Sequence, residues 1–191
     1  MQRKKGRETM RGKSIQWLKE SARKNDIAIA GSLVIEEGGN YYNRLVFVYP
    51  NGHIETYDKR HTFTLAGEHK LYTAGSKRLI LDFKGWKICP MICYDLRFPV
   101  WARNTENYDL LFYVANWPKA RASAWKSLLV ARAHENQCYV VGVNRVGIDG
   151  VGIEYQGDSM VVSPKGEVLA HLDENEALKT VELNWEDLAS F

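Results

Sequence analysis

The stretch MICYDLRFP, residues 91–99, ends an apolar run on a cysteine and continues at once into polar and aromatic residues. A thiol at the end of a buried strand, where the chain turns into a helix, lies near backbone N–H groups and the positive end of the helix dipole. Both features favour the thiolate, and the same N–H groups can stabilise an oxyanion. A cysteine that ends an apolar strand is also often a small buried hydrophobe, so Cys93 is either a nucleophile or a packing residue.

A nucleophilic thiol needs a group that takes its proton, and histidine is the most common one. None of the five histidines lies in a local cysteine-protease signature, although His61 and His69 fall in a long aperiodic stretch. Lys59 offers a different cation at the start of that stretch, which also contains Glu68. A lone exposed lysine is usually just solvated, but one at a strand end beside a long loop is a better candidate for a site.

The elements around these residues predict an α/β fold with layers and a mixed sheet. Apolar spacing after Ser14 predicts an amphipathic helix, and a three-strand meander follows it. The aperiodic stretch 59–76 predicts a long functional loop. Strands are predicted at 27–35, 41–49, 53–58, 78–83, 87–93, 108–117, 138–146, 158–163, 167–172 and 178–183, helices at 14–25, 98–103 and 123–137, and a Gly-rich loop after residue 146.

Composition places the chain among globular proteins. Its 191 residues are 45% hydrophobic and 26% charged, enough for one domain with a buried core. The net charge of +3 sits largely in the first 24 residues and is more typical of a solvated end than of a nucleic-acid site. The three cysteines form no CxxC pair, which predicts a reduced, cytoplasmic setting and no zinc site. No apolar run approaches the length of a membrane span.

Seven motifs occur in order along the chain: YDKRHTF, AGEHKLYTAG, CYDLRFP, YVANWP, ARAHENQ, VGVNRVG and YQGDS. Together they strongly resemble the nitrilase (carbon–nitrogen hydrolase) superfamily, most closely its omega-amidase branch, from about Glu8 to Leu183. The resemblance implies an αββα sandwich of the nitrilase type, with four layers and mixed β-sheets, as a single domain over residues 1–191. It further implies a homodimer, a small-molecule amide substrate, and no cofactor or metal.

The resemblance also assigns catalytic roles, because members of the superfamily use a Glu-Lys-Cys triad and often a second glutamate. Cys93 corresponds to the nucleophile, Lys59 to the triad lysine and Glu68 to the second glutamate. As an ammonium, Lys59 would favour the thiolate and, with the backbone N–H of Tyr94, stabilise the oxyanion.

Five further residues are candidates for the substrate side of the site. Two of them, Asn116 and Trp117, follow a predicted buried strand and are similar to pocket residues of the superfamily. Weaker candidates for holding a substrate carboxylate are Arg97, Arg121 and Tyr155. For each of the five, a structural hydrogen bond or a packing role is an equally common alternative.

The triad glutamate has no counterpart among the motifs. In the superfamily it follows the first core strand in a Pro-Glu step, upstream of the helix that begins here near Ser14. Glu8 lies in ETMRGKSIQWL, which is similar to the segment after that glutamate. We therefore expect the chain to lack the first strand and the C-terminal tail of its relatives. We also expect little amidase turnover from these 191 residues, since general base catalysis contributes about 10²- to 10⁴-fold.

The leading functional prediction is an omega-amidase-type thiol hydrolase. It would release ammonia from the terminal amide of a small 2-oxo acid, such as 2-oxoglutaramate or 2-oxosuccinamate, through a cysteine thioester. One alternative keeps the fold without the activity, as a catalytically incomplete subunit with a binding role. Another is a different reaction on the same scaffold, the hydrolysis of a nitrile or a carbamoyl amide.

Overall fold

The computed structural model describes residues 6–189. These residues divide into two compact units, of which the first ends at Leu79 and the second begins at Ile80. Each unit has its own sheet, and each carries a different part of the predicted chemistry.

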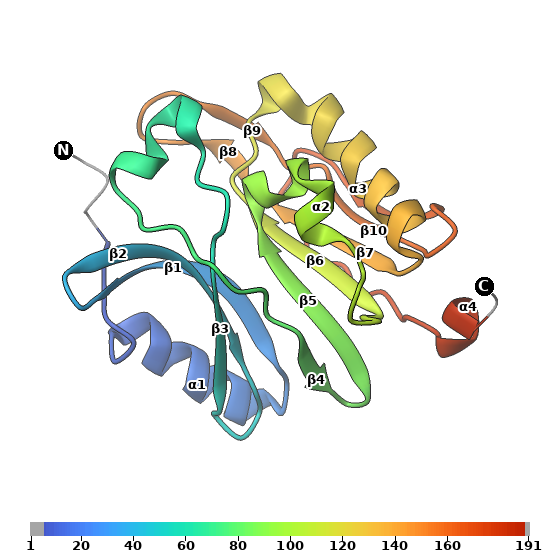
Figure 1. The fold of residues 1–191 in the computed structure, drawn as a ribbon, viewed down its shortest axis with the longest axis horizontal. Helices are drawn as coiled ribbons and strands as arrows, with labels where there is room; N and C mark the ends of the chain where they lie inside the picture. The colour runs from blue at the N-terminus through green and yellow to red at the C-terminus, as the bar shows by residue number, and fades with distance from the viewer. Residues whose placement is uncertain (1–5, 190–191) are drawn as a thin grey trace. The chain divides into compact units, whose positions relative to one another are not determined.

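The first unit packs one helix against a three-stranded antiparallel sheet. Helix α1 (Lys13–Asn25) precedes strands β1 (Ile29–Glu37), β2 (Asn40–Val48) and β3 (Ile54–Asp58), which pair in sequence order. Figure 1 shows α1 lying along one face of this sheet. The buried face of α1 packs on β2, as apolar residues at helical spacing require. This core contains Ile15, Leu18, Ala22, Val46 and Val48. The predicted helix and meander are confirmed.

Glu8 has a structural position in the same unit. Its carboxylate oxygen Oε2 accepts a hydrogen bond from the backbone N–H of Ser14, 3.0 Å away, in the first turn of α1. The N-cap residue, Gly12, has no side chain to satisfy such a group. Glu8 also forms an isolated bridge with Ile35 of β1. Glu8 therefore stabilises the start of α1.

The aperiodic stretch after β3 forms a closed loop with two short 3₁₀ helices, η2 (Thr64–Ala66) and η3 (Glu68–Lys70). The N–H of Gly75 donates to the carbonyl oxygen of Lys59 at 2.9 Å, which joins the two ends of the loop. A Cβ atom on Gly75 would lie 2.1 Å from the carbonyl oxygen of Asp58, so only glycine fits. The contact between Gly75 and Lys59 therefore closes the loop.

The second unit contains a six-stranded mixed sheet in the order β11-β10-β7-β6-β5-β4. The three central strands, β5, β6 and β7, run parallel, and the outer pairs are antiparallel. The predicted hairpin is confirmed as β4 and β5. The strands are β4 (Leu81–Phe83), β5 (Trp86–Ile92), β6 (Leu110–Ala115), β7 (Tyr139–Asn144), β10 (Ser159–Val162) and β11 (Val168–Leu172).

Helices cover one face of this sheet, as Figure 1 shows. Helix α3 (Ala122–Asn136) packs on β7 and β10. The approach is close, since a Cβ atom on Gly142 would lie 2.5 Å from Cδ1 of Leu129. The predicted helix at 98–103 is confirmed as the short helix α2 (Pro99–Ala102), and a 3₁₀ helix that was not predicted, η4 (Cys93–Arg97), precedes it. Another 3₁₀ turn, η5 (Lys119–Arg121), precedes α3.

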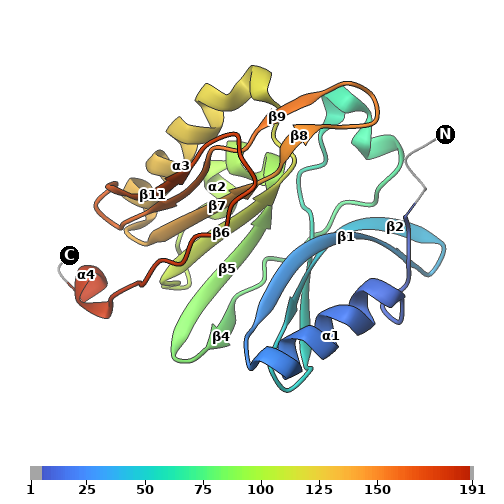
Figure 2. The ribbon, with the colours of Figure 1, turned by 180° about the vertical axis from the view of Figure 1, so that it is seen from behind.

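Two predictions near the C-terminus are wrong. The Gly-rich loop is a β-hairpin of β8 (Val146–Ile148) and β9 (Glu154–Gln156). Residues 178–183 form no strand, and Figure 2 shows their segment running across the sheet instead of extending it. The cause is an anchor on β7, because the N–H of Asn184 donates to the Tyr139 hydroxyl at 3.1 Å. That hydroxyl donates to Asp187 in the short helix α4 (Trp185–Ala189), which was not predicted.

Candidate active site

Cys93 lies at a sharp strand-to-helix turn. It directly follows β5 and opens η4 with a φ of +47°, in the left-handed region that costs a non-glycine residue about 1 kcal/mol or more. Two buried side chains fix this turn. The carboxylate of Asp95 accepts the N–H of Ile92 at 3.1 Å, and Arg132 on α3 donates to the carbonyl oxygen of Leu96 at 2.7 Å. The backbone of the turn is therefore held in its strained form.

The sulfur of Cys93 is the most accessible of the three thiols. Cys93 is partly exposed, whereas Cys89 and Cys138 are fully buried, and all three are free of disulfides. Burial raises the pKa of the Cys138 thiol well above its ordinary value. The Cys93 sulfur lies 3.9 Å from the carbonyl oxygen of Asn116. Among these cysteines, only Cys93 combines access with a constrained position.

The structure brings most of the predicted substrate residues to this end of the sheet. Asn116 is exposed beside the sulfur, and the guanidinium of Arg97 lies 5.2 Å from the centre of the Trp117 ring. Trp117 itself is buried, and its indole N–H donates to the backbone carbonyl of Arg121 at 2.8 Å. The Arg121 side chain is exposed. Tyr94 follows Cys93 in η4, with its ring edge-on to Phe98.

Tyr155 lies on the β8–β9 hairpin and is occupied within it. Its hydroxyl donates to the Asp149 carboxylate at 3.0 Å, and the Arg145 guanidinium lies 4.5 Å from the ring centre. Burial raises the pKa of Tyr155, and the hydrogen bond to Asp149 adds to the shift. Backbone N–H groups, first that of Ile153, lower the pKa of Asp149. Neither Arg145 nor Asp149 was predicted, because the hairpin that joins them was taken for a loop.

The first unit brings Lys59 and Glu68 together. Lys59 follows the last residue of β3, and its ammonium Nζ lies 2.7 Å from Oε2 of Glu68, both side chains being buried. The same oxygen accepts the N–H of Phe63 at 2.5 Å, and Oε1 accepts the side-chain amide of Asn43 at 3.1 Å. Asn43 was not predicted.

The charge of Glu68 depends on these partners. Burial alone would raise the pKa of its carboxyl group, but the charge of Lys59 and the hydrogen bonds from Lys59, Phe63 and Asn43 outweigh burial, and the pKa is lowered. At neutral pH, Glu68 is therefore a carboxylate. A paired, buried carboxylate of this kind holds a lysine side chain in one place.

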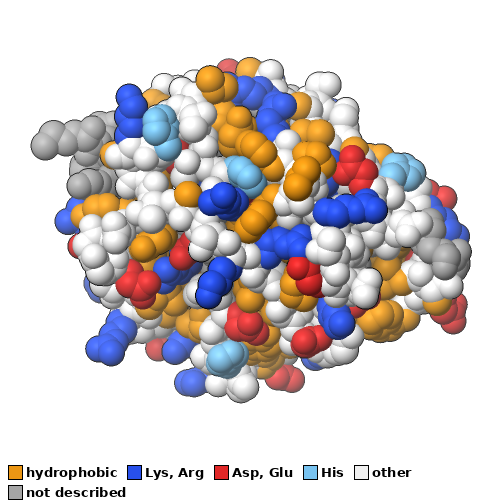
Figure 3. Space-filling model, viewed as in Figure 1, with side chains coloured by type: hydrophobic (Ala, Val, Ile, Leu, Met, Phe, Trp, Pro, Cys, Tyr) orange, Lys and Arg blue, Asp and Glu red, His pale blue; other side chains and the backbone are white. Residues whose placement is uncertain are grey.

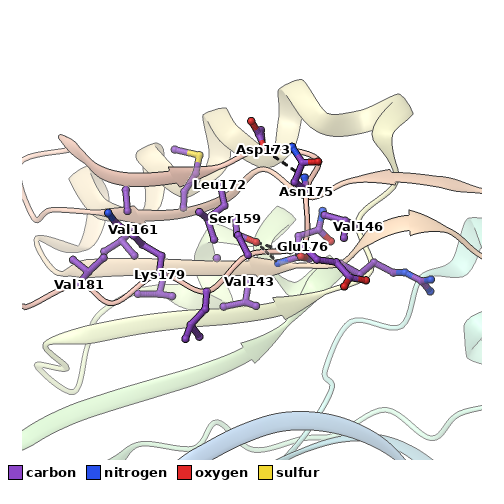
Figure 4. Close-up of a pocket in the computed structure, with 18 residues that line it drawn as sticks. Val143, Val146, Ser159, Val161, Leu172, Asp173, Asn175, Glu176, Lys179 and Val181 are labelled. Carbon is purple, nitrogen blue, oxygen red and sulfur yellow. Dashed lines mark hydrogen bonds between the residues drawn. The ribbon is translucent and has the colours of Figure 1, made fainter.

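A cavity of about 420 Å³ lies elsewhere in the second unit, between the sheet and the segment that crosses it. Figure 4 shows side chains of β7, β10 and β11 lining it together with side chains of residues 173–181. Its lining is mostly apolar and includes Val143, Val161, Leu172 and Val181. None of the predicted site residues lines it, although Asn144, whose side chain bonds to the backbone of Trp117, is part of the lining.

Residues 6–189 show neither a metal cluster nor a membrane span. No cluster of three or more histidine, cysteine, aspartate or glutamate side chains has the arrangement of a metal site. No helix in this part of the chain has the length and apolar character needed to cross a bilayer. On the face drawn in Figure 3, basic and acidic side chains are interspersed.

Comparison with known proteins extends these observations. Residues 4–191 match the sequence profile of a family described as carbon-nitrogen hydrolase. The chain is 48% identical over 165 residues to the omega-amidase YafV of Escherichia coli K12, covering 86% of this chain and 64% of the relative. It is 38% identical over 183 residues to the 2-oxoglutaramate amidase of Bacillus subtilis, covering 93% and 70% respectively. The chain therefore spans slightly less than two thirds of the Escherichia coli relative.

A solved structure shares the fold. XC1258 from Xanthomonas campestris, described as a CN-hydrolase superfamily protein with an arsenic adduct in its active site, superimposes with a TM-score of 0.94. The two sequences are 43% identical, and the match covers 96% of this chain and 72% of that one. The predicted α/β fold of the nitrilase type, with mixed sheets, is confirmed.

Proposed function

Because the chain belongs to the carbon–nitrogen hydrolase family, we propose that it carries the nucleophile of an omega-amidase-type thiol amidohydrolase. The observation that carries the proposal is Cys93, a partly exposed thiol in a strained strand-to-helix turn, beside two cysteines that are fully buried. The substrate class is the terminal amide of a small 2-oxo acid, such as 2-oxoglutaramate. The names of the Escherichia coli and Bacillus subtilis relatives support this choice.

The proposed reaction has two stages. The Cys93 thiolate attacks the amide carbon, and a C–S bond forms while the carbonyl π electrons move to oxygen. The oxyanion then collapses, the C–N bond breaks, and the nitrogen takes up a proton and leaves as ammonia, which produces a thioester. Water adds to the thioester and releases the carboxylic acid together with the thiol. The backbone N–H of Tyr94 is the proposed oxyanion donor, since it follows the nucleophile in the turn.

Lys59 and Glu68 supply the charge in this proposal. The pKa of Glu68 is lowered, and its carboxylate, 2.7 Å from Nζ of Lys59, fixes the direction of the Lys59 side chain. The Lys59 ammonium stabilises the Cys93 thiolate and the oxyanion. The proposal therefore requires that Lys59 face Cys93 in the active enzyme, with both units forming the single hydrolase domain.

The substrate side uses residues near the sulfur. The guanidinium of Arg97, stacked on the Trp117 ring, keeps its N–H groups available for a substrate carboxylate, and Asn116 forms the adjacent wall. Tyr155 is a weaker candidate, because its hydroxyl already donates to Asp149. Arg121 is the other weaker candidate. We further propose a homodimer in the cytoplasm. Three free cysteines support the reducing compartment.

The test is ammonia release from 2-oxoglutaramate by the purified protein. It is run on this chain and on a version extended at its N-terminus by a strand that ends in Pro-Glu. We expect Cys93→Ala to remove all turnover and Cys138→Ala to retain it. Equal turnover by the two lengths would show that the general base lies within these 191 residues. Turnover that survives Cys93→Ala, or no ammonia from either length, would refute the proposed function.

A further inference from the structure

The segment that forms a wall beside the Cys93 sulfur, residues 116 and 117, lies outside the strands of the sheet. Strand β6 ends at Ala115, and the next residue, Asn116, places its carbonyl oxygen 3.9 Å from the sulfur. A carbonyl at this position determines how close a substrate can approach the thiol. Whatever fixes residues 116 and 117 therefore also fixes one side of the reaction site.

A single side chain on the neighbouring strand satisfies the backbone of Trp117. Asn144 is the last residue of β7 and lies opposite Ala115 in the parallel register. Its oxygen Oδ1 accepts the N–H of Trp117 at 2.7 Å, and its nitrogen Nδ2 donates to the carbonyl of the same residue at 3.1 Å. The carboxamide thus bonds to Trp117 as a strand backbone would.

The carboxamide of Asn144 is itself held by a further hydrogen bond. Nδ2 of Asn144 also donates to the carbonyl oxygen of Gly157 at 2.7 Å. The backbone N–H of Asn144 donates to the Ser159 hydroxyl at 3.0 Å, and this hydroxyl donates to the backbone carbonyl of Asn144 at 3.2 Å. Ser159 of β10 therefore fixes the backbone of Asn144, and Gly157, between β9 and β10, fixes its side chain.

We propose that Asn144 is a positioning residue, which acts by holding the Asn116–Trp117 segment against the Cys93 thiol. The proposal rests on the proposed function for the identity of the reaction, but its geometry belongs to the second unit alone. Asparagine suits the role because one acceptor and two donors are needed in one plane. Aspartate offers no donor, and serine is too short to reach Trp117 from both sides. A displacement of about 1 Å at such a wall costs on the order of 100-fold in rate.

The chain contains a matched control for this bonding pattern. Asn104 accepts the N–H of Tyr108 at 2.8 Å, donates to the carbonyl of Tyr108 at 2.8 Å and donates to the carbonyl of Asn136 at 3.2 Å. It therefore makes the same three kinds of bond as Asn144. Tyr108 precedes β6, so this second clamp lies at the other end of that strand, about 20 Å away for six residues.

The experiment compares Asn144→Ala with Asn104→Ala in this chain and, for ammonia release, also in the version extended at its N-terminus. Cys93 alkylation by iodoacetamide is followed against pH, urea unfolding gives stability, and ammonia release gives kcat/KM. Both variants should lose similar stability. Only Asn144→Ala should shift the pH midpoint of Cys93 alkylation, with about a tenfold change in rate at neutral pH, and lower kcat/KM about 100-fold. Asn144→Asp and Asn104→Asp, which keep the shape and one acceptor, serve if the alanine variants do not fold.

The outcomes separate this inference from the proposed function. An Asn144 variant whose alkylation profile matches that of the wild type, or that matches its Asn104 counterpart in every measurement, would overturn the positioning role. A wild-type protein that releases no ammonia in either length, with or without the N-terminal strand ending in Pro-Glu, would refute the amidase proposal instead. In that case the alkylation profiles still decide whether Asn144 positions the wall beside the thiol.

Discussion

The charged pair of the loop and the thiol of the turn are held by opposite means. Lys59 and Glu68 keep their places through side-chain bonds, including one to Asn43 on a neighbouring strand. Cys93 keeps its place through its backbone, which buried groups hold at a positive φ. The pair should therefore respond to pH and to the loss of single atoms. The turn should respond to changes in backbone freedom and to loss of the Asp95 or Arg132 side chain that holds it.

The largest expected effect concerns the thiols of the second unit. Limited treatment with iodoacetamide should modify Cys93 at least about 100-fold faster than Cys89 or Cys138, because only an accessible thiolate reacts and the other two thiols are buried. Peptide mapping by mass spectrometry measures the three rates. Preferential labelling of either buried cysteine would contradict the assignment of the nucleophile.

The next largest effect is expected from breaking the ion pair of Lys59 and Glu68 in the first unit. Lys59→Met should abolish turnover and lower the free energy of unfolding by about 3 kcal/mol, because it leaves the buried Glu68 carboxylate without its cation. Lys70→Met is the control, since Lys70 lies exposed in the same loop and should change stability by less than about 0.5 kcal/mol. Urea unfolding measures both. Similar losses of unfolding free energy for the two variants would show that the pair of Lys59 and Glu68 does not stabilise the fold.

The contribution of the Lys59–Glu68 pair to the free energy of unfolding should depend on pH. The pKa of Glu68 is lower in the folded protein than its ordinary value of 4.5, so its contribution is fully present above that pH. It is lost as the pH falls from about 4.5 through the lowered pKa. The difference in unfolding free energy between wild type and Glu68→Gln should therefore shrink with acidification in this range. A difference that stays constant from pH 7 to pH 3 would show that the carboxylate is not stabilised on folding.

The smallest expected effect concerns the support of Glu68. Asn43→Ala removes one hydrogen bond to a charged group and should cost about 1.5 kcal/mol. Asn40→Ala, at the exposed start of the same strand, is the matched control and should be nearly neutral. Thermal unfolding of the two variants gives the comparison. A larger loss for Asn40→Ala would mean that Asn43 does not support Glu68.

Periodic segments and local motifs could be predicted from the sequence. Helix α1 and strands β1 to β3 appear within a few residues of their predicted ends, because apolar spacing determines which face is buried. The resemblance to the nitrilase superfamily assigned catalytic roles to Cys93, Lys59 and Glu68 by motif, and the structure pairs Lys59 with Glu68. The roles remain predictions. The placement of Cys93 near Lys59 and Glu68 across the two units also remains a prediction.

Contacts that depend on strand register could not be predicted. Asn43 reaches Glu68 because β2 pairs with β3 so that its backbone carbonyl accepts the N–H of Lys59. Asn144 reaches Trp117 because β7 lies beside β6. Neither neighbour is encoded by local spacing. The hairpin of β8 and β9 was missed because its glycines hide the alternation of a strand.

The backbone conformation at position 93 favours a residue other than cysteine. A left-handed φ suits glycine, so Cys93→Gly relieves strain and should leave the folded chain as stable as before or more so. Random substitution under selection for folding alone would therefore tend to remove the cysteine from this place. A cysteine at a position where the backbone favours glycine is therefore explained by the chemistry proposed for its sulfur and not by its backbone conformation.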